Sequence, residues 1–207
     1  MPELPEVETI RRDLAPELEG RQITVVRIHH ADIILGSLSG LEFRRRLESR
    51  LIRGVDRRAK WLLLKFDDGL LVTQLRMTGR FAIGRGAAPP LAGFRHVAAE
   101  FDLDDGRTLF YDDVRRLGGF LLLSWSEWAR EESRFGPEPL ATGFRASDLG
   151  DALRRGRAPV KNALMDQSRV AGVGKIYACE ALHRARIDPT RTVSDHSDVE
   201  IRRLHRS

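Results

Sequence analysis

The feature that most constrains the fold is a pair of apolar segments, each interrupted by Asp-Asp-Gly. The first consists of residues 61–66 and 70–75 around Asp67-Asp68-Gly69, and the second of residues 98–103 and 107–113 around Asp104-Asp105-Gly106. Asp-Gly between apolar runs is a strong signal for a β-hairpin, because glycine accepts a positive φ. The sequence therefore predicts two hairpins.

Other elements can be placed around these hairpins. A helix should begin near Pro5 and bury Val7, Ile10, Leu14 and Leu18, with Pro16 marking a kink or an earlier end. We expect strands over 23–30 and 119–125 and a short helix over 41–51. The segment 84–93, rich in Gly, Ala and Pro, is predicted to be a mobile loop.

The pattern changes near residue 126, after which helical spacing replaces strand signals. We therefore predict an α+β chain, with a β-rich domain over 1–130 and a helical domain over 131–207. The last apolar positions lie close to Ser207 with no helix stop signal after them. We expect the 207 residues to be a fragment of a longer protein.

Composition narrows the class of protein. Hydrophobic residues make up 42% and charged residues 31%, as in folded proteins rather than disordered ones. No apolar run approaches the roughly 20 residues of a membrane span, and the N-terminus does not resemble a secretory signal. The single cysteine, Cys179, excludes an internal disulfide and is expected to be buried. We expect a cytoplasmic protein with no membrane partner, and no metal site or cofactor within this chain.

The basic residues are mostly arginine, and the chain has a net charge of +5. Such a bias is typical of some genomes and is not interpreted as function. The chain has an acidic segment over 1–20 and, further along, a basic segment over 44–60. This uneven charge fits either a binding surface or an ordinary solvated face.

The N-terminus offers the most specific chemistry. If Met1 is removed, Pro2 presents a secondary amine that can attack an electrophilic carbon and form an iminium. Glu3 and Glu6 lie beside it, and Glu3 could transfer protons during that reaction. Taken locally, Pro2, Pro5 and the two glutamates are more typical of an ordinary helix start.

Three further segments contain candidate DNA-contact residues. Lys60 precedes an apolar strand, Met77 follows another on a turn, and Arg115 and Leu117 lie in a turn after residues 107–113. Lysine can bind phosphate or exchange protons, and Met or Leu can wedge between unstacked bases. A surface lysine, a core methionine and a plain surface turn are the alternatives.

The helical half contains candidate phosphate contacts. Gly172-Val173-Gly174-Lys175 precedes a helix, where glycines let a phosphate approach backbone N–H groups. The spacing fits neither a dinucleotide-binding fingerprint nor a Walker A loop. The basic residues Arg154, Arg155, Arg157 and Lys161 form a further phosphate-binding set.

Several motifs, in the same order, resemble the formamidopyrimidine-DNA glycosylase family, which includes the endonuclease VIII branch. They are MPELPEVETIRR, RRAKWLLL, LRMTGRF, YDDVRRLGG, GPEPL, LMDQ and GVGKIYACEAL. The resemblance covers about residues 1–190. It implies a two-layer β-sandwich with flanking helices, then a helix–two-turn–helix domain, with DNA in the cleft between them.

The resemblance also implies roles for single residues. Pro2 would be the Schiff-base nucleophile, Glu3 the general acid, Glu6 a supporting carboxylate and Lys60 the β-hairpin lysine. Met77, Arg115 and Leu117 would fill the gap left by an extruded base. The residues expected to contact DNA elsewhere are His96, Arg157, Lys161 and Lys175.

The implied activity is that of a bifunctional DNA glycosylase and AP lyase for oxidised bases in base excision repair. Damaged double-stranded DNA would be the partner of a monomer in the bacterial cytoplasm or nucleoid. The family usually has His-Leu-Gly where this chain has Gln74-Leu75-Arg76, Pro at Val114, Phe at Leu117 and Asn at Lys175. Zinc is expected only if a C-terminal finger follows in the full-length protein.

Two other functions remain open from the sequence. The chain could be a catalytically impaired fragment or paralogue that binds damaged DNA, since a retained Met1 would turn the Pro2 nitrogen into an amide. It could also be a basic RNA-binding protein, which would prefer A-form RNA.

Overall fold

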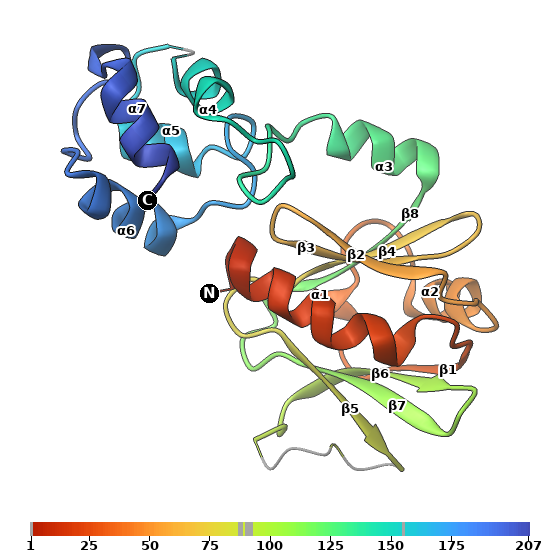
Figure 1. Ribbon diagram of the computed structural model, residues 1–207. Coiled ribbons are helices and arrows are strands. Elements are labelled where there is room, and N and C mark those ends of the chain that lie inside the picture. Colours follow the sequence, from red (N-terminus) through yellow and green to blue (C-terminus); the bar gives the residue numbers. More distant parts are fainter. Residues whose placement is uncertain (1, 87–88, 90–92, 155) are drawn as a thin grey trace. The chain divides into compact units, whose positions relative to one another are not determined.

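The computed structural model describes residues 2–86, 89, 93–154 and 156–207. Residues 87–88 and 90–92 of the predicted mobile loop, and Arg155, lie outside the described residues. The chain divides into two compact units, Met1–Trp128 and Ala129–Ser207. Figure 1 shows two layers of strands in the first unit and helices in the second. The predicted α+β class is confirmed.

The first unit contains two antiparallel sheets of four strands. One has the order β1-β6-β7-β5 and the other β2-β3-β4-β8. The strands are β1 (Ile23–Ile28), β2 (Gly54–Arg58), β3 (Trp61–Lys65), β4 (Gly69–Gln74), β5 (Arg80–Arg85), β6 (Val97–Leu103), β7 (Arg107–Asp112) and β8 (Gly119–Ser124). Its helices are α1 (Leu4–Leu18) and α2 (Gly40–Leu47), with a 3₁₀ turn over Ala31–Ile33, and α3 (Trp125–Glu132) contains the boundary between the two units.

Both predicted hairpins are confirmed. β3 pairs with β4 and β6 with β7, each antiparallel across its Asp-Asp-Gly segment. Gly106 has a φ of +79°, a conformation in which a side chain would be strained. The predicted strands at 23–30 and 119–125 correspond to β1 and β8.

Two strands, β2 and β5, lie outside the sequence prediction. β2 (GVDRR) and β5 (RFAIGR) are the outer strands of their sheets. An outer strand needs few apolar residues, because one of its edges and much of its surface face solvent. Their polar sequences therefore contain little of the alternation that identified the inner strands.

Side chains from both sheets and from α1 form one core. Val7, Leu14 and Leu18 of α1 are buried in it, as the helical spacing predicted. Phe120 of β8 contacts the rings of Phe101 and Tyr111 from the opposite sheet. α1 continues past Pro16 to Leu18.

Two of the three connections that pass between the sheets lie at neighbouring points. The connection 75–79 leads from β4 to β5, and the connection 113–118 leads from β7 back to β8. Gln74 pairs with Gly119, and Arg80 pairs with Asp112. Because both ends of the two connections are paired, the connections lie beside each other.

The second unit is helical. Its helices are α4 (Ala146–Leu153), α5 (Val160–Met165), α6 (Lys175–Ala185) and α7 (Asp198–His205). Two successive turns separate α5 from α6. The core includes Leu153, Leu164, Leu182 and Leu204, one from each helix. This is the expected helix–two-turn–helix arrangement.

Candidate active site

The N-terminal residues lie at the start of α1. Glu3 precedes the helix and is almost completely buried, although it is an acid. Its backbone N–H donates to Oε2 of Glu6 at 2.9 Å, so Glu6 fixes the conformation at the helix start. Pro2 is partly exposed and directly precedes this ordered turn. Pro2 is therefore bonded directly to the first fixed residue of the helix start.

Lys60 lies in the tight turn between β2 and β3, rather than at the start of a strand. Arg58 pairs with Trp61, so Ala59 and Lys60 form the two-residue loop of the hairpin. Ala59 has a φ of +53° and is buried. A residue other than glycine in this left-handed region costs about 1 kcal/mol, so surrounding contacts must hold the turn.

A buried ion pair provides those contacts. The Arg57 Nη1 donates to the Ala59 carbonyl at 2.9 Å, and its Nε donates to Glu8 of α1 at 3.1 Å. The Arg57 side chain is only 7% exposed, so water competes little with these bonds. Glu8 and Arg57 thereby attach the Lys60 turn to the helix that begins at Glu3.

The electrostatic environment also joins Lys60 to this region. Burial lowers the pKa of the Lys60 ammonium, Glu3 opposes that shift, and the nearby Arg76 guanidinium adds to it. The charges of Glu3 and Arg76 therefore act on Lys60 in opposite directions.

The residues expected to fill a DNA gap lie on the two sheet-crossing connections. Met77 is 49% exposed on one connection and Leu117 is 48% exposed on the other. Arg115 Nη1 lies 3.0 Å from the Met77 sulfur, so its side chain reaches across to the first connection. Exposed apolar side chains are not core packing, which removes that alternative for Met77.

His96 is exposed and directly precedes β6. Its backbone N–H donates to Oδ1 of Asp112 at 2.6 Å, and its carbonyl accepts from the Asp113 N–H at 3.1 Å. The backbone of His96 is therefore hydrogen-bonded to the end of β7, where the 113–118 connection begins.

In the second unit, three of the sequence motifs contact one another around Gln167. The Gln167 side chain accepts from the Gly172 N–H at 2.8 Å and donates to the Val173 carbonyl at 2.9 Å. Its own carbonyl accepts from Gly136 at 2.9 Å. These bonds set the two turns that lead into α6, whose first residue, Lys175, is exposed.

The remaining basic residues differ in how they are held. Arg157 is exposed and Lys161 is partly buried at the start of α5. Arg154 is already paired with Asp198, which disfavours the phosphate contact predicted for it. Arg155 lies outside the described residues.

The expectation that Cys179 is buried is wrong. It is exposed, because the buried face of α6 is formed by Ala178, Leu182 and Ala185. At 100° per residue, a position directly after Ala178 turns away from that face.

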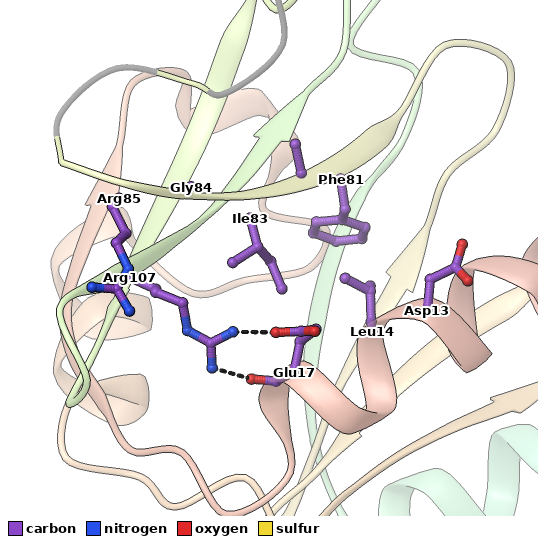
Figure 2. Close-up of a pocket in the computed structure, with 9 residues that line it drawn as sticks. Asp13, Leu14, Glu17, Phe81, Ile83, Gly84, Arg85 and Arg107 are labelled. Carbon is purple, nitrogen blue, oxygen red and sulfur yellow. Dashed lines mark hydrogen bonds and ion pairs between the residues drawn. The ribbon is translucent and has the colours of Figure 1, made fainter.

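A pocket of about 470 Å³ lies between the second half of α1 and β5. Figure 2 shows Leu14, Phe81 and Ile83 lining it, with Arg107 donating hydrogen bonds to Glu17 across one end. None of the predicted catalytic residues lines this pocket. This pocket is therefore separate from the residues that the sequence predicts to be catalytic.

The described part of the chain contains no cluster of three or more His, Cys, Asp or Glu residues that could hold a metal ion. No helix among the described residues is long and apolar enough to cross a membrane.

Sequence reasoning missed several residues that organise these segments. Glu8, Arg57, Thr78 and the two buried carboxylates of Asp112 and Asp113 were not singled out. The signal available for the aspartates was two consecutive acids at the end of an otherwise apolar strand, where burial forces each to find donors.

A strand-rich unit with a buried acid at its N-terminus, joined to a helix–two-turn–helix unit, defines a class of DNA-processing protein. Two family models match the chain. The formamidopyrimidine-DNA glycosylase N-terminal domain matches residues 1–120, and the formamidopyrimidine-DNA glycosylase H2TH domain matches residues 135–207. The chain belongs to the formamidopyrimidine-DNA glycosylase family.

Individual relatives agree with this assignment. The chain is 42% identical over 207 residues to the formamidopyrimidine-DNA glycosylase of Chloroflexus aurantiacus, covering 99% of this chain and 73% of that protein. The Lactococcus lactis enzyme, solved non-covalently bound to DNA with an abasic site, aligns with a TM-score of 0.88 and 29% identity, over 99% of this chain and 78% of that one. A relative solved with DNA containing carbocyclic 8-oxoguanine aligns with a TM-score of 0.89 and 30% identity, over 99% and 76%.

Proposed function

We propose that this chain excises oxidised bases from double-stranded DNA and then cleaves the strand, using the Pro2 amine as nucleophile. The observation that carries the proposal is the arrangement at the start of α1. Glu3, the residue after Pro2, is buried there, and Arg57 and Glu8 attach the Lys60 turn to the same helix. The chemistry needs a nucleophilic amine, an acid and a cation together, and all three come from unit 1.

The reaction begins when the damaged nucleotide leaves the base stack, because its glycosidic carbon is unreachable inside the duplex. The Pro2 nitrogen, freed by removal of Met1, attacks the anomeric carbon of the sugar. The proton that this nitrogen loses passes through the Glu3 carboxylate to the ring oxygen, and the ring opens. The bond to the base breaks, the base leaves with its electron pair and takes up a proton, and an iminium joins Pro2 to the sugar.

Strand cleavage follows from the same intermediate. The positive iminium acidifies the adjacent sugar carbon, which loses a proton, and the electron pair expels the 3′ phosphate. Hydrolysis of the iminium returns the free Pro2 amine. Glu6 contributes by holding the Glu3 backbone at 2.9 Å, so the carboxylate starts from a fixed position.

DNA binding would draw on both units. Met77, Arg115 and Leu117 are proposed to fill the space left by the extruded base, and His96 to contact the backbone nearby. Arg157, Lys161 and Lys175 would contact phosphates from the helical unit, with the Gln167 turns presenting the start of α6. We assign any zinc to a C-terminal finger outside these residues, and place the monomeric enzyme in the bacterial cytoplasm or nucleoid.

The test is a cleavage assay on two end-labelled duplexes, one with 8-oxoguanine and one with a preformed abasic site. The wild-type chain should release the free base from the first and nick both. Glu3→Gln should slow base release more than nicking at the abasic site, which has no base to expel. Tight binding of both duplexes without any nicking would overturn the enzymatic proposal in favour of a damaged-DNA-binding protein.

A further inference from the structure

The two exposed connections 75–79 and 113–118 share one buried carboxylate. Asp113 is 1% exposed. Its Oδ1 accepts from the Thr78 hydroxyl and from the Arg115 N–H, the latter at 3.2 Å. Its Oδ2 accepts from the Gly118 N–H at 2.9 Å. One side chain thus binds both connections.

Thr78 completes the link from the other side. Its hydroxyl donates to Asp113 and at the same time accepts from the Arg115 N–H at 3.2 Å. A hydroxyl can do both, because it has one proton and two lone pairs. The residue after Met77 is therefore hydrogen-bonded to the backbone of Arg115.

Tyr111 fills the space between the connections. Its hydroxyl donates to Oδ2 of Asp113 at 3.2 Å. A Cβ on Gly79 would lie 2.6 Å from this hydroxyl, and a Cβ on Gly118 would lie 2.4 Å from it. Only glycine permits this approach at either position. Burial and the Asp113 carboxylate raise the pKa of Tyr111, so the phenol remains a donor.

Asp112 serves a different segment. It is fully buried and accepts from the His96 N–H at 2.6 Å and from the Arg80 guanidinium at 3.0 Å. Consecutive residues of a strand point to opposite faces. The two aspartates at the end of β7 therefore hold separate segments, Asp112 that of His96 and Asp113 the two sheet-crossing connections.

We propose that Asp113 and Thr78 are positioning residues that couple the two connections, so that Met77, Arg115 and Leu117 enter DNA as one unit. The proposal rests on the proposed function for its consequence in repair. Without the bond from Thr78, the paired strand ends and the Arg115–Met77 contact would remain, but Met77 and Leu117 would be held less firmly relative to each other. Ordering them separately in the complex would then weaken gap filling, because more conformational freedom is lost on binding.

The primary test uses the variant Thr78→Val, which keeps the shape of the side chain and removes the hydroxyl. Thr78→Ser is the conservative variant that keeps the hydroxyl. Base release from an 8-oxoguanine duplex should fall roughly tenfold in kcat/KM for the valine variant and recover with serine. Nicking of single-stranded abasic DNA should stay within about twofold, because no base must be extruded and no partner strand needs support. Thr108→Val is the matched control, since Thr108 also donates to a carboxylate, Asp102, but at the far end of β7.

Coupling itself is measured with Met77→Ala and Leu117→Ala, alone and together, on the 8-oxoguanine duplex. In the wild-type background, the loss of kcat/KM in the double variant should differ at least about threefold from the product of the two single losses. In the Thr78→Val background, the double loss should equal that product. Equal coupling in both backgrounds, or a valine variant as active as the serine variant, would overturn the proposal.

Amide hydrogen exchange separates this inference from the proposed function. Exchange at the Arg115 N–H should be faster in Thr78→Val than in the wild-type chain. In Thr108→Val it should stay at the wild-type rate. Both expectations hold whether or not the chain cleaves DNA. A wild-type chain that cleaves neither substrate would contradict the proposed function. Unchanged exchange at Arg115 in the valine variant would contradict the coupling of the connections.

Discussion

Lys60 is expected to act in base release rather than in strand cleavage. Its ammonium is half-buried in a hairpin turn and interacts with Glu3. We predict that Lys60→Ala slows base release from the 8-oxoguanine duplex at least about tenfold more than nicking at an abasic site. Abasic sugars open to an aldehyde, which Pro2 can attack without expelling a base. Equal losses of both activities in a folded variant would contradict this division of roles.

Arg76 occupies a backbone conformation that favours glycine, with a φ of +50°. We predict that Arg76→Gly is more stable than Arg76→Ala by about 1 kcal/mol, because only glycine relieves the left-handed strain. Denaturant unfolding of the pair measures this difference.

Both Arg76 substitutions should also raise the pKa of Lys60 toward its ordinary 10.5, since the Arg76 charge lowers it. NMR titration of labelled lysine checks that direction. A lower Lys60 pKa in either variant would show that Arg76 does not act on it through charge.

Candidate residues could be named from the sequence where a motif marks them. Pro2, Glu3, Met77 and Leu117 could be singled out because they lie in segments that resemble the family, and their roles stay predictions. Asp113 and Thr78 could not, because their function lies in a bond across 35 positions that only the paired strands create. Cys179 was misjudged because small neighbours do not reveal which side of a helix faces the core.

At the scale of elements, α1 and the β2–β3 hairpin are joined by Glu8. Hydrogen bonds from Arg11, then Arg12 and Arg57, lower the pKa of the Glu8 carboxyl to about 2. A lowered carboxyl pKa stabilises the fold above the ordinary value of 4.5, and this contribution is lost as the pH falls toward 2.

We predict that Glu8→Gln costs about 1–3 kcal/mol at pH 7 and flattens the loss of stability between pH 4.5 and 2. Glu42→Gln removes an exposed ion pair with Arg46 and should cost no more than about 0.5 kcal/mol. Denaturant unfolding at several pH values measures both. Equal costs for the two variants would mean that Glu8 is only a surface charge.

The strands differed in how far the sequence revealed them. The inner strands β3, β4, β6 and β7 have apolar runs and glycine turns, so both hairpins could be placed. The outer strands β1 and β8 are apolar enough to be predicted, whereas the polar residues of the outer strands β2 and β5 resemble loop sequence. The helix expected over 41–51 ends at Leu47, because Ser49 turns the chain with a φ of +69° toward β2.

At the scale of the whole molecule, the basic residues of the helical unit should determine general DNA affinity. We predict that Lys175→Asn lowers the salt dependence of binding by about one released counterion, equally for damaged and intact duplex. Arg115→Ala should instead cost about 1–3 kcal/mol on damaged duplex and much less on intact duplex. Binding titrations over a range of salt concentrations measure both. An unchanged salt slope for Lys175→Asn would remove Lys175 from the DNA interface.

The central claim is that the Pro2 nitrogen becomes covalently attached to DNA, and borohydride trapping tests it most directly. The chain with Met1 removed is mixed with abasic duplex and reduced, and the adduct is digested and mapped by mass spectrometry. We predict a stable adduct at the Pro2 nitrogen that disappears when Met1 is retained, because an amide nitrogen has no available lone pair. Attachment at Lys60 or another lysine, with Pro2 unmodified, would contradict the mechanism.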